Sequence, residues 1–214
     1  MGKILALLVI VCIALCMVVS YASADRLLLI PTGTTLSTGG VKVQAALSTE
    51  NDNAKVYWAN LGISRFEVEG ARFQDFGPET LDAISAQVSV MPETSFTPAV
   101  ALGVRDISDE TKDEGALYNG QSIYLAVSKG VPVTGGIPIL FQDVKIHGGI
   151  GTGSLSGIFF GVQGTLPMGL QVMGEFDTED FNFGAAYNIA PMLKIQAESL
   201  KGDFYYGATF STSF

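Results

Sequence analysis

The chain has 214 residues, with 12 lysines and arginines against 21 aspartates and glutamates, and a formal net charge of −9 at pH 7. This acidic balance argues against a nucleic-acid partner, because binding to phosphates requires a basic surface. The length suits a single domain. Both cysteines, Cys12 and Cys16, lie near the N-terminus, so we expect no disulfide and no thiol chemistry in the rest of the chain.

The first 24 residues have the pattern of a secretory signal peptide. Lys3 precedes an apolar run over residues 4–19, and an Ala-Ser-Ala cleavage site ends at Ala24. A retained transmembrane helix is the alternative, but the run is close to the lower length limit for spanning a bilayer and the cleavage site follows it directly. We therefore predict export, cleavage of residues 1–24, and one β-barrel domain over residues 25–214.

Beyond the signal, apolar and polar residues alternate in segments of about ten residues, separated by turn signals. No apolar stretch there approaches the roughly twenty residues of a membrane-spanning helix. Because backbone polar groups in lipid must be paired internally, a membrane-spanning chain of this kind must close on itself. We predict an all-β fold, an antiparallel up-and-down transmembrane β-barrel. The predicted strands are 41–48, 58–71, 81–91, 98–106, 121–131, 144–152, 157–166, 169–177, 181–189, 193–200 and 204–214.

These eleven strands conflict with the even strand number of single-chain bacterial barrels. Either residues 26–30 supply a further strand or one of the predicted strands is wrong. We expect twelve strands, with ten as the alternative.

The connections between the predicted strands are of two alternating kinds. One kind carries prolines, at Pro92 and Pro98, Pro132 and Pro138, Pro167, and Pro191. The connections between them are acidic or polar and cover residues 107–120, 153–156, 178–180 and 201–203. Alternate connections of an antiparallel barrel lie at the same end, so we expect a proline rim and an acidic rim. If the last strand runs toward the periplasm, the proline rim is periplasmic.

The polar half of the alternation gives a set of candidate lumen-lining residues. They are Arg65, Glu67, Glu69, Lys145, His147, Glu175, Lys194 and Glu198. In one interpretation they fill a narrow barrel and pair with one another; in the other they line a small polar conduit. A conduit with this charge set predicts mild cation selectivity. We expect the filled interior, which predicts no conductance.

The last predicted strand alternates strictly and ends on an aromatic residue. Phe204, Tyr206, Phe210 and Phe214 share one of its faces. This ending resembles the last strand of bacterial outer-membrane β-barrels, which the barrel-insertion machinery recognises. The resemblance implies an insertion signal at Tyr206, Phe210 and Phe214, and it implies membrane lipid and that machinery as partners.

Four short motifs point to a narrower group. They are Ile30-Pro31-Thr32-Gly33-Thr34, residues 157–163, Gly174-Glu175-Phe176-Asp177, and residues 181–187. Together they resemble barrels associated with exopolysaccharide or capsule export, although this chain is far shorter and has no lipoprotein cysteine. The resemblance implies polysaccharide or small solutes as further partners.

The sequence offers little for catalysis or metal binding. His147 is the only histidine, and Gly148 and Gly149 follow it, so the local His-x-Ser arrangement of deacylase barrels is absent. A distant serine such as Ser128 could still approach this histidine. One histidine with scattered carboxylates gives no ligand spacing. We therefore predict no enzyme activity, no metal and no cofactor.

The function expected from the sequence is a small porin-like or envelope-structural protein of the outer membrane. The alternative is a secreted soluble β-sandwich that acts as a binding or surface-layer module. The outward face separates the two, because only a membrane barrel places apolar and aromatic residues outside. The aromatic residues expected there are Trp58, Tyr124, Phe160, Phe176, Tyr187, Tyr206 and Phe214.

Overall fold

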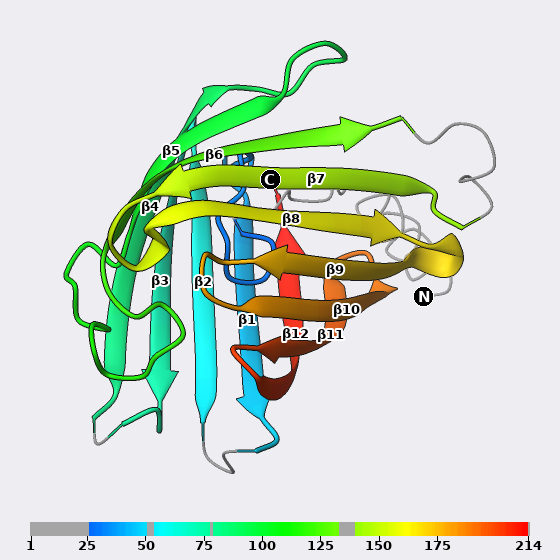
Figure 1. Ribbon diagram of the computed structural model, residues 1–214. Coiled ribbons are helices and arrows are strands. Elements are labelled where there is room, and N and C mark those ends of the chain that lie inside the picture. The colour runs from blue at the N-terminus through cyan, green and yellow to red at the C-terminus, as the bar shows by residue number, and fades with distance from the viewer. Residues whose placement is uncertain (1–25, 51–53, 78, 133–139, 214) are drawn as a thin grey trace, which may run out of the picture.

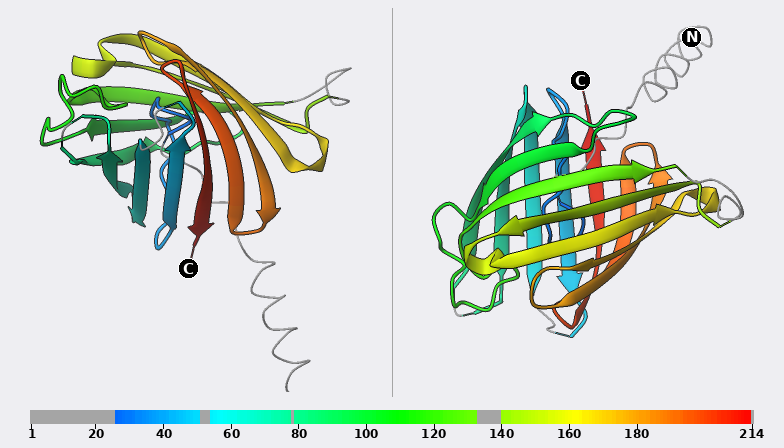
Figure 2. Two further views of the ribbon diagram at one scale, coloured as in Figure 1. Left: turned by 90° about the horizontal axis from the view of Figure 1, so that it is seen from below. Right: turned by 45° about the horizontal axis from the view of Figure 1, so that its top comes forward.

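The computed structural model describes residues 26–50, 54–77, 79–132 and 140–213 and is a closed antiparallel barrel (Figures 1 and 2). Each strand pairs with its neighbours in sequence, and β1 closes the ring on β12. The strands are β1 (Val41–Ser48), β2 (Lys55–Ile63), β3 (Phe66–Gln74), β4 (Leu81–Met91), β5 (Ala99–Arg105), β6 (Ser122–Val131), β7 (Asp143–Gly151), β8 (Gly157–Thr165), β9 (Leu170–Phe176), β10 (Phe181–Ala190), β11 (Leu193–Leu200) and β12 (Asp203–Thr212). Two 3-10 turns, η2 (Gly153–Leu155) and η3 (Pro167–Gly169), lie in connections.

The prediction of twelve strands is confirmed, but the source of the additional strand differs from the one expected. The predicted strand 58–71 is in fact parts of β2 and β3, joined by a tight turn at Ser64 and Arg65. Ser64 has a left-handed backbone, with φ of 59°. The sequence hides this turn because no glycine, proline or asparagine marks it. Residues 26–30 form no strand of the wall.

The alternation sorts side chains to the two faces of the wall. On β12, Phe204, Tyr206 and Phe210 are exposed, whereas Tyr205 and Thr209 are buried. All twelve strands expose at least one large apolar side chain on the same outer face. Examples from one strand each are Val43, Leu61, Val68, Ile84, Leu102, Ile123, Ile146, Val162, Leu170, Phe183, Ile195 and Phe210.

This outer face is incompatible with the predicted alternative of a soluble sandwich, which needs two stacked sheets with apolar inner faces. Among the described residues, no helix is long and apolar enough to cross a membrane. Part of the aromatic prediction is wrong: Trp58 and Tyr124 are 1% and 6% exposed and lie inside the barrel. Phe160, Tyr187 and Tyr206 are outside, while Phe214 lies beyond the described residues.

The connections form two ends of different chemistry. Those after β4, β6, β8 and β10 contain Pro92 and Pro98, Pro132, Pro167, and Pro191, and we call this end the proline rim. Pro138 lies outside the described residues. The connections after β5, β7, β9 and β11 lie at the opposite end, the acidic rim.

The interior of the barrel is filled by the chain itself. Residues 26–36, which we call the lumen segment, run inside the ring of strands and are drawn in dark blue in Figures 1 and 2. Residues 106–121, the inward loop, connect β5 to β6 and send Leu117 and Tyr118 into the same space. The resulting apolar core contains Leu28, Leu29, Trp58, Phe73, Leu117, Tyr118, Leu200 and Tyr205.

Candidate functional site

The lumen segment is anchored on one buried carboxylate. Glu175 of β9 is 3% exposed, and its two oxygens accept hydrogen bonds from three consecutive backbone N–H groups of the segment. Leu28 N and Leu29 N lie at 2.9 and 2.7 Å, and Ile30 N lies 3.3 Å from both oxygens. Successive amides that converge in this way form a concave anion site. The carboxylate of Glu175 therefore occupies the anion site that the backbone amides of residues 28–30 form.

A tight reversal presents these amides. Leu27 N donates to Ile30 O at 3.0 Å, and Arg26 pairs with Pro31 across the turn. The wall makes room for the turn at Gly161 and Gly184, where an added Cβ would lie 2.5 Å from Leu27 and 2.7 Å from Leu28. Residues 26–30, one of the two sources considered for a further strand, instead form a turn whose apolar side chains contact the interior.

Arg26 ties the start of the segment to β1 and β3. Its guanidinium forms a buried ion pair with Glu69 and donates to Gln44 Oε1 at 2.8 Å. The same group lies 4.0 Å over the Trp58 ring, a favourable position for a cation. Glu69 also accepts from the Tyr118 hydroxyl of the inward loop. One carboxylate therefore joins the lumen segment, the wall and the inward loop.

The end of the segment is held by Glu67 and Ser128. Leu36 N donates to Glu67 Oε2 at 2.6 Å, and Gly33 N donates to Ser128 Oγ at 2.8 Å. Ser128 Oγ lies 2.7 Å from His147 Nδ1, so the distant serine considered from sequence does reach the histidine. Ser128 is fully buried and already accepts from Gly33. This geometry positions the segment and leaves the hydroxyl without access to a substrate.

The inward loop closes the acidic side. Trp58 Nε1 donates to the Tyr118 hydroxyl at 3.0 Å, and the Arg105 guanidinium lies 4.5 Å over the Tyr118 ring. Asp106 holds the base of the loop by accepting from Thr111 N at 2.9 Å and Thr111 Oγ1 at 2.6 Å. With Leu117 and Tyr118 packed on the lumen segment, this side of the barrel is filled.

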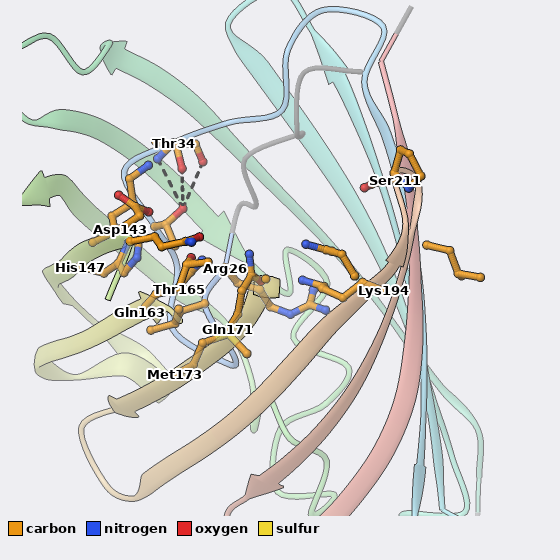
Figure 3. A pocket seen from close by; sticks show the side chains of 18 of the residues that line it. Arg26, Thr34, Asp143, His147, Gln163, Thr165, Gln171, Met173, Lys194 and Ser211 are labelled. Carbon is orange, nitrogen blue, oxygen red and sulfur yellow. Dashed lines mark hydrogen bonds between the residues drawn. The ribbon is translucent and has the colours of Figure 1, made fainter. Parts of the chain in front are cut away.

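The other side retains a cavity of about 540 Å³, which we call the vestibule (Figure 3). Asp143, Thr165, Leu193 and Ser211 line it, and they lie at the strand ends next to the proline rim. Arg26 and Thr32 of the lumen segment line it as well. The vestibule is therefore a cup that faces the proline rim, with the lumen segment on its inner side.

The charged groups of the vestibule are mostly cationic. Arg26, Lys145 and Lys194 line it together with the single carboxylate Asp143. Lys145 Nζ lies 3.5 Å from Glu93, which belongs to the β4–β5 connection. Burial of the Glu93 carboxyl works to raise its pKa, but a hydrogen bond from Gly130 N and the two ammonium groups of Lys145 and Lys129 hold that pKa below its ordinary value.

The structure distributes the candidate lumen residues over three environments. Glu67, Glu69 and Glu175 bind the lumen segment, and Glu198 is buried on β11. Lys145, His147 and Lys194 line the vestibule. The prediction for Arg65 is wrong, because this residue lies in the exposed β2–β3 turn. The alternation placed it inside only because it treated two strands as one.

Sequence reasoning missed Arg26, Ser128 and Glu93 as parts of this site. Ser128 was considered only as a partner of His147. No periodic signal could have found Arg26 or Glu93, since both lie outside the strands. Within the described residues, no group of three or more histidines, cysteines or carboxylates is placed to hold a metal ion.

No family model and no curated protein matches the chain. Among solved structures, it is similar to a mutant of the Rh. blastica porin, with 12% sequence identity and a TM-score of 0.31. The match covers 75% of this chain and 56% of the porin chain, so the chain spans little more than half the length of that porin. The barrel itself is established by the strand register of the chain.

Replacing Glu175 by alanine should release the lumen segment. Three buried N–H groups would lose their acceptor, and each unsatisfied group costs about 1–3 kcal/mol. A cysteine introduced as Leu29→Cys, which is shielded in the folded barrel, should then react at least roughly tenfold faster with a water-soluble thiol reagent. Asp143→Ala is the matched control, because Asp143 has no hydrogen bond to the segment. Equal labelling rates in the two backgrounds would contradict the anchoring role.

Proposed function

We propose that the protein is a small, porin-like β-barrel of the outer membrane, without enzymatic activity, whose lumen is closed by its own chain. The observation that carries this proposal is the apolar outer face, to which all twelve strands contribute exposed side chains such as Leu61, Ile123 and Ile195. Soluble monomers rarely expose contiguous apolar patches beyond a few hundred Å². A lipid bilayer is the environment that such a face requires.

The interior supports the same proposal. Buried charged groups in its interior, such as Glu175 and Arg26, pair with the lumen segment or with the wall. A soluble barrel would bury an apolar core inside and present polar groups outside. Here the wall exposes large apolar residues on its outer face as well. The apolar core inside the barrel is formed by wall residues such as Trp58 and Phe73 together with residues of the lumen segment and the inward loop.

The last strand gives the orientation. In barrels of this kind it ends at the periplasmic side, and β12 ends at the proline rim. The proline rim and the vestibule are then periplasmic, and the acidic rim faces outward. Tyr206 and Phe210 lie on the outer face of β12, where the insertion machinery would meet them as part of the proposed signal with Phe214.

A role in exopolysaccharide export, which the sequence resemblance implies, is not part of this proposal. Passage of a saccharide chain requires a continuous open lumen. Here Leu28 of the lumen segment and Tyr118 of the inward loop belong to one packed apolar cluster inside the barrel. The closed lumen instead favours a protein that admits solutes only as far as the vestibule in this state.

Two neighbouring residues of β9 test the membrane environment. Val172→Arg should lower the free energy of unfolding in lipid by about 2–4 kcal/mol if the site lies near the bilayer midplane, because its side chain faces outward. Gln171→Arg should cost much less, since Gln171 lines the vestibule. The measurement is urea unfolding in lipid vesicles, followed by heat-modifiable migration on gels.

The same pair also supplies the contradicting outcome. Equal costs for the two substitutions would mean that Val172 does not face lipid. A wild-type protein that stays monomeric in detergent-free buffer and shows no heat-modifiable form would remove the membrane location altogether.

The wild-type barrel should be silent in planar-bilayer recordings. The lumen segment and the inward loop pack against each other inside the barrel, so we expect no continuous aqueous path through it. The recording should be made with protein whose heat-modifiable migration shows that it is folded. A steady conductance in the range of general porins would contradict the closed lumen and make solute passage the leading function.

A further inference from the structure

We propose that the vestibule is a binding site for a small, polar organic anion that enters from the proline rim. The inference rests on the proposed function only for the compartment from which the anion arrives, which would be the periplasm. The binding chemistry itself rests on the lining of the cavity. Its volume of about 540 Å³ lies within the usual range for small-molecule sites.

The charge of the lining favours an anion. Arg26, Lys145 and Lys194 face the cavity, and Asp143 is the one carboxylate among its lining residues. Glu198 is buried further along β11 and interacts electrostatically with Lys194 and Lys42, but neither Glu198 nor Lys42 lines the cavity. Counting this flanking pair, one acid and one base, leaves the excess of two cations unchanged. Counting also the ion-pair partners Glu69, Glu93 and Lys129 reduces the excess to one.

The carboxylates from which the sequence predicts cation selectivity bind groups outside the vestibule. Glu67 and Glu175 accept backbone N–H groups of the lumen segment, and Glu69 pairs with Arg26. These carboxylates are buried and none of them lines the vestibule. The lumen segment therefore separates the charges of the interior, with acids around the segment and cations in the open cup.

Lys194 is the lining cation whose ammonium group no carboxylate of the described residues contacts, although Glu198 acts on it at longer range. Within the described part of the chain, no hydrogen bond or ion pair reaches its ammonium group. Arg26, by contrast, is paired with Glu69, and Lys145 shares Glu93 with Lys129. A lysine ammonium has three donors and no acceptor, so its missing partner must be an acceptor.

His147 supplies a second, independent donor. Its Nε2 is buried and has no hydrogen-bond partner among the described residues, and the ring lines the vestibule. Ser128 Oγ accepts from Gly33 N, and His147 Nδ1 is the one described acceptor within reach of the Ser128 hydroxyl hydrogen. The hydroxyl then donates to Nδ1, which leaves the proton of the neutral ring on Nε2. This buried N–H requires an acceptor.

The remaining lining combines neutral polar residues with apolar ones, among them Leu27, Met173 and Met192. The neutral polar residues include Gln142, Gln163, Thr165, Gln171, Asn188 and Ser211. In Figure 3, Arg26 lies between His147 on one side of the cavity and Lys194 on the other. This arrangement surrounds the cavity with donors and suits a solute with an acidic group and a polar body, such as a small carboxylate or phosphate ester.

The test is calorimetric titration of the full, detergent-folded chain with citrate at constant ionic strength. The wild type should bind citrate, and K194Q should weaken binding by roughly tenfold or more, as expected for a lost hydrogen bond to a charged group. K112Q is the matched control, because it removes the same charge from the inward loop on the acidic side. Its affinity should match the wild type.

A second measurement holds even if K194Q does not fold. Because His147 is the only histidine of the chain, the imidazole ¹⁵N spectrum reports one site. Citrate should shift the Nε2 resonance of the wild type, and spermidine, a polyvalent cation, should not. An unmoved Nε2 resonance in citrate, or equal losses of citrate affinity in K194Q and K112Q, would overturn the inference.

The two proposals fail separately. A barrel that folds into lipid but does not bind citrate overturns the anion site and leaves the membrane proposal intact. Citrate binding by a protein that never enters lipid supports the anion site and overturns the proposed location.

Discussion

The structure depends on one interaction, the hydrogen bonds from three consecutive backbone amides of residues 28–30 to the buried Glu175 carboxylate. A carboxylate inside a barrel wall is costly unless its oxygens are satisfied. A free turn of chain inside a lumen would likewise leave its own amides unpaired. The three amides satisfy the carboxylate oxygens, and the carboxylate satisfies the amides. This pairing allows an apolar core to form inside a barrel whose outer face is also apolar.

This interaction also sets the charge distribution of the lumen. The lumen segment forms hydrogen bonds or ion pairs with Glu67, Glu69 and Glu175. The vestibule on the proline side is therefore lined by Lys145, Lys194 and His147, and not by these three carboxylates. The same chain that closes the barrel therefore determines the chemistry of its vestibule. The inward loop, tied through Tyr118 to Glu69 and Trp58, closes the opposite side without altering that chemistry.

The barrel could be predicted from sequence because a two-residue alternation is a local property of each strand, as in residues 204–210 of β12. The strand count was right, and of the two explanations left open the wrong strand prediction is the one that holds. The turn at Ser64 and Arg65 carries no glycine, proline or asparagine, and residues 26–30 have strand composition but form no strand of the wall. The vestibule could not be predicted. It depends on which acids the lumen segment occupies, and contacts such as Leu36 with Glu67 join residues 31 positions apart that no periodicity connects.

The most direct test of the closed lumen is amide hydrogen exchange of the wild-type protein, measured by NMR in detergent micelles. The amides of Leu28, Leu29 and Ile30 should exchange as slowly as strand amides such as that of Ala46, because they are buried and bonded to Glu175. Exchange at these three positions as fast as at Ser95, in an exposed connection of the proline rim, would show that the segment does not occupy the lumen.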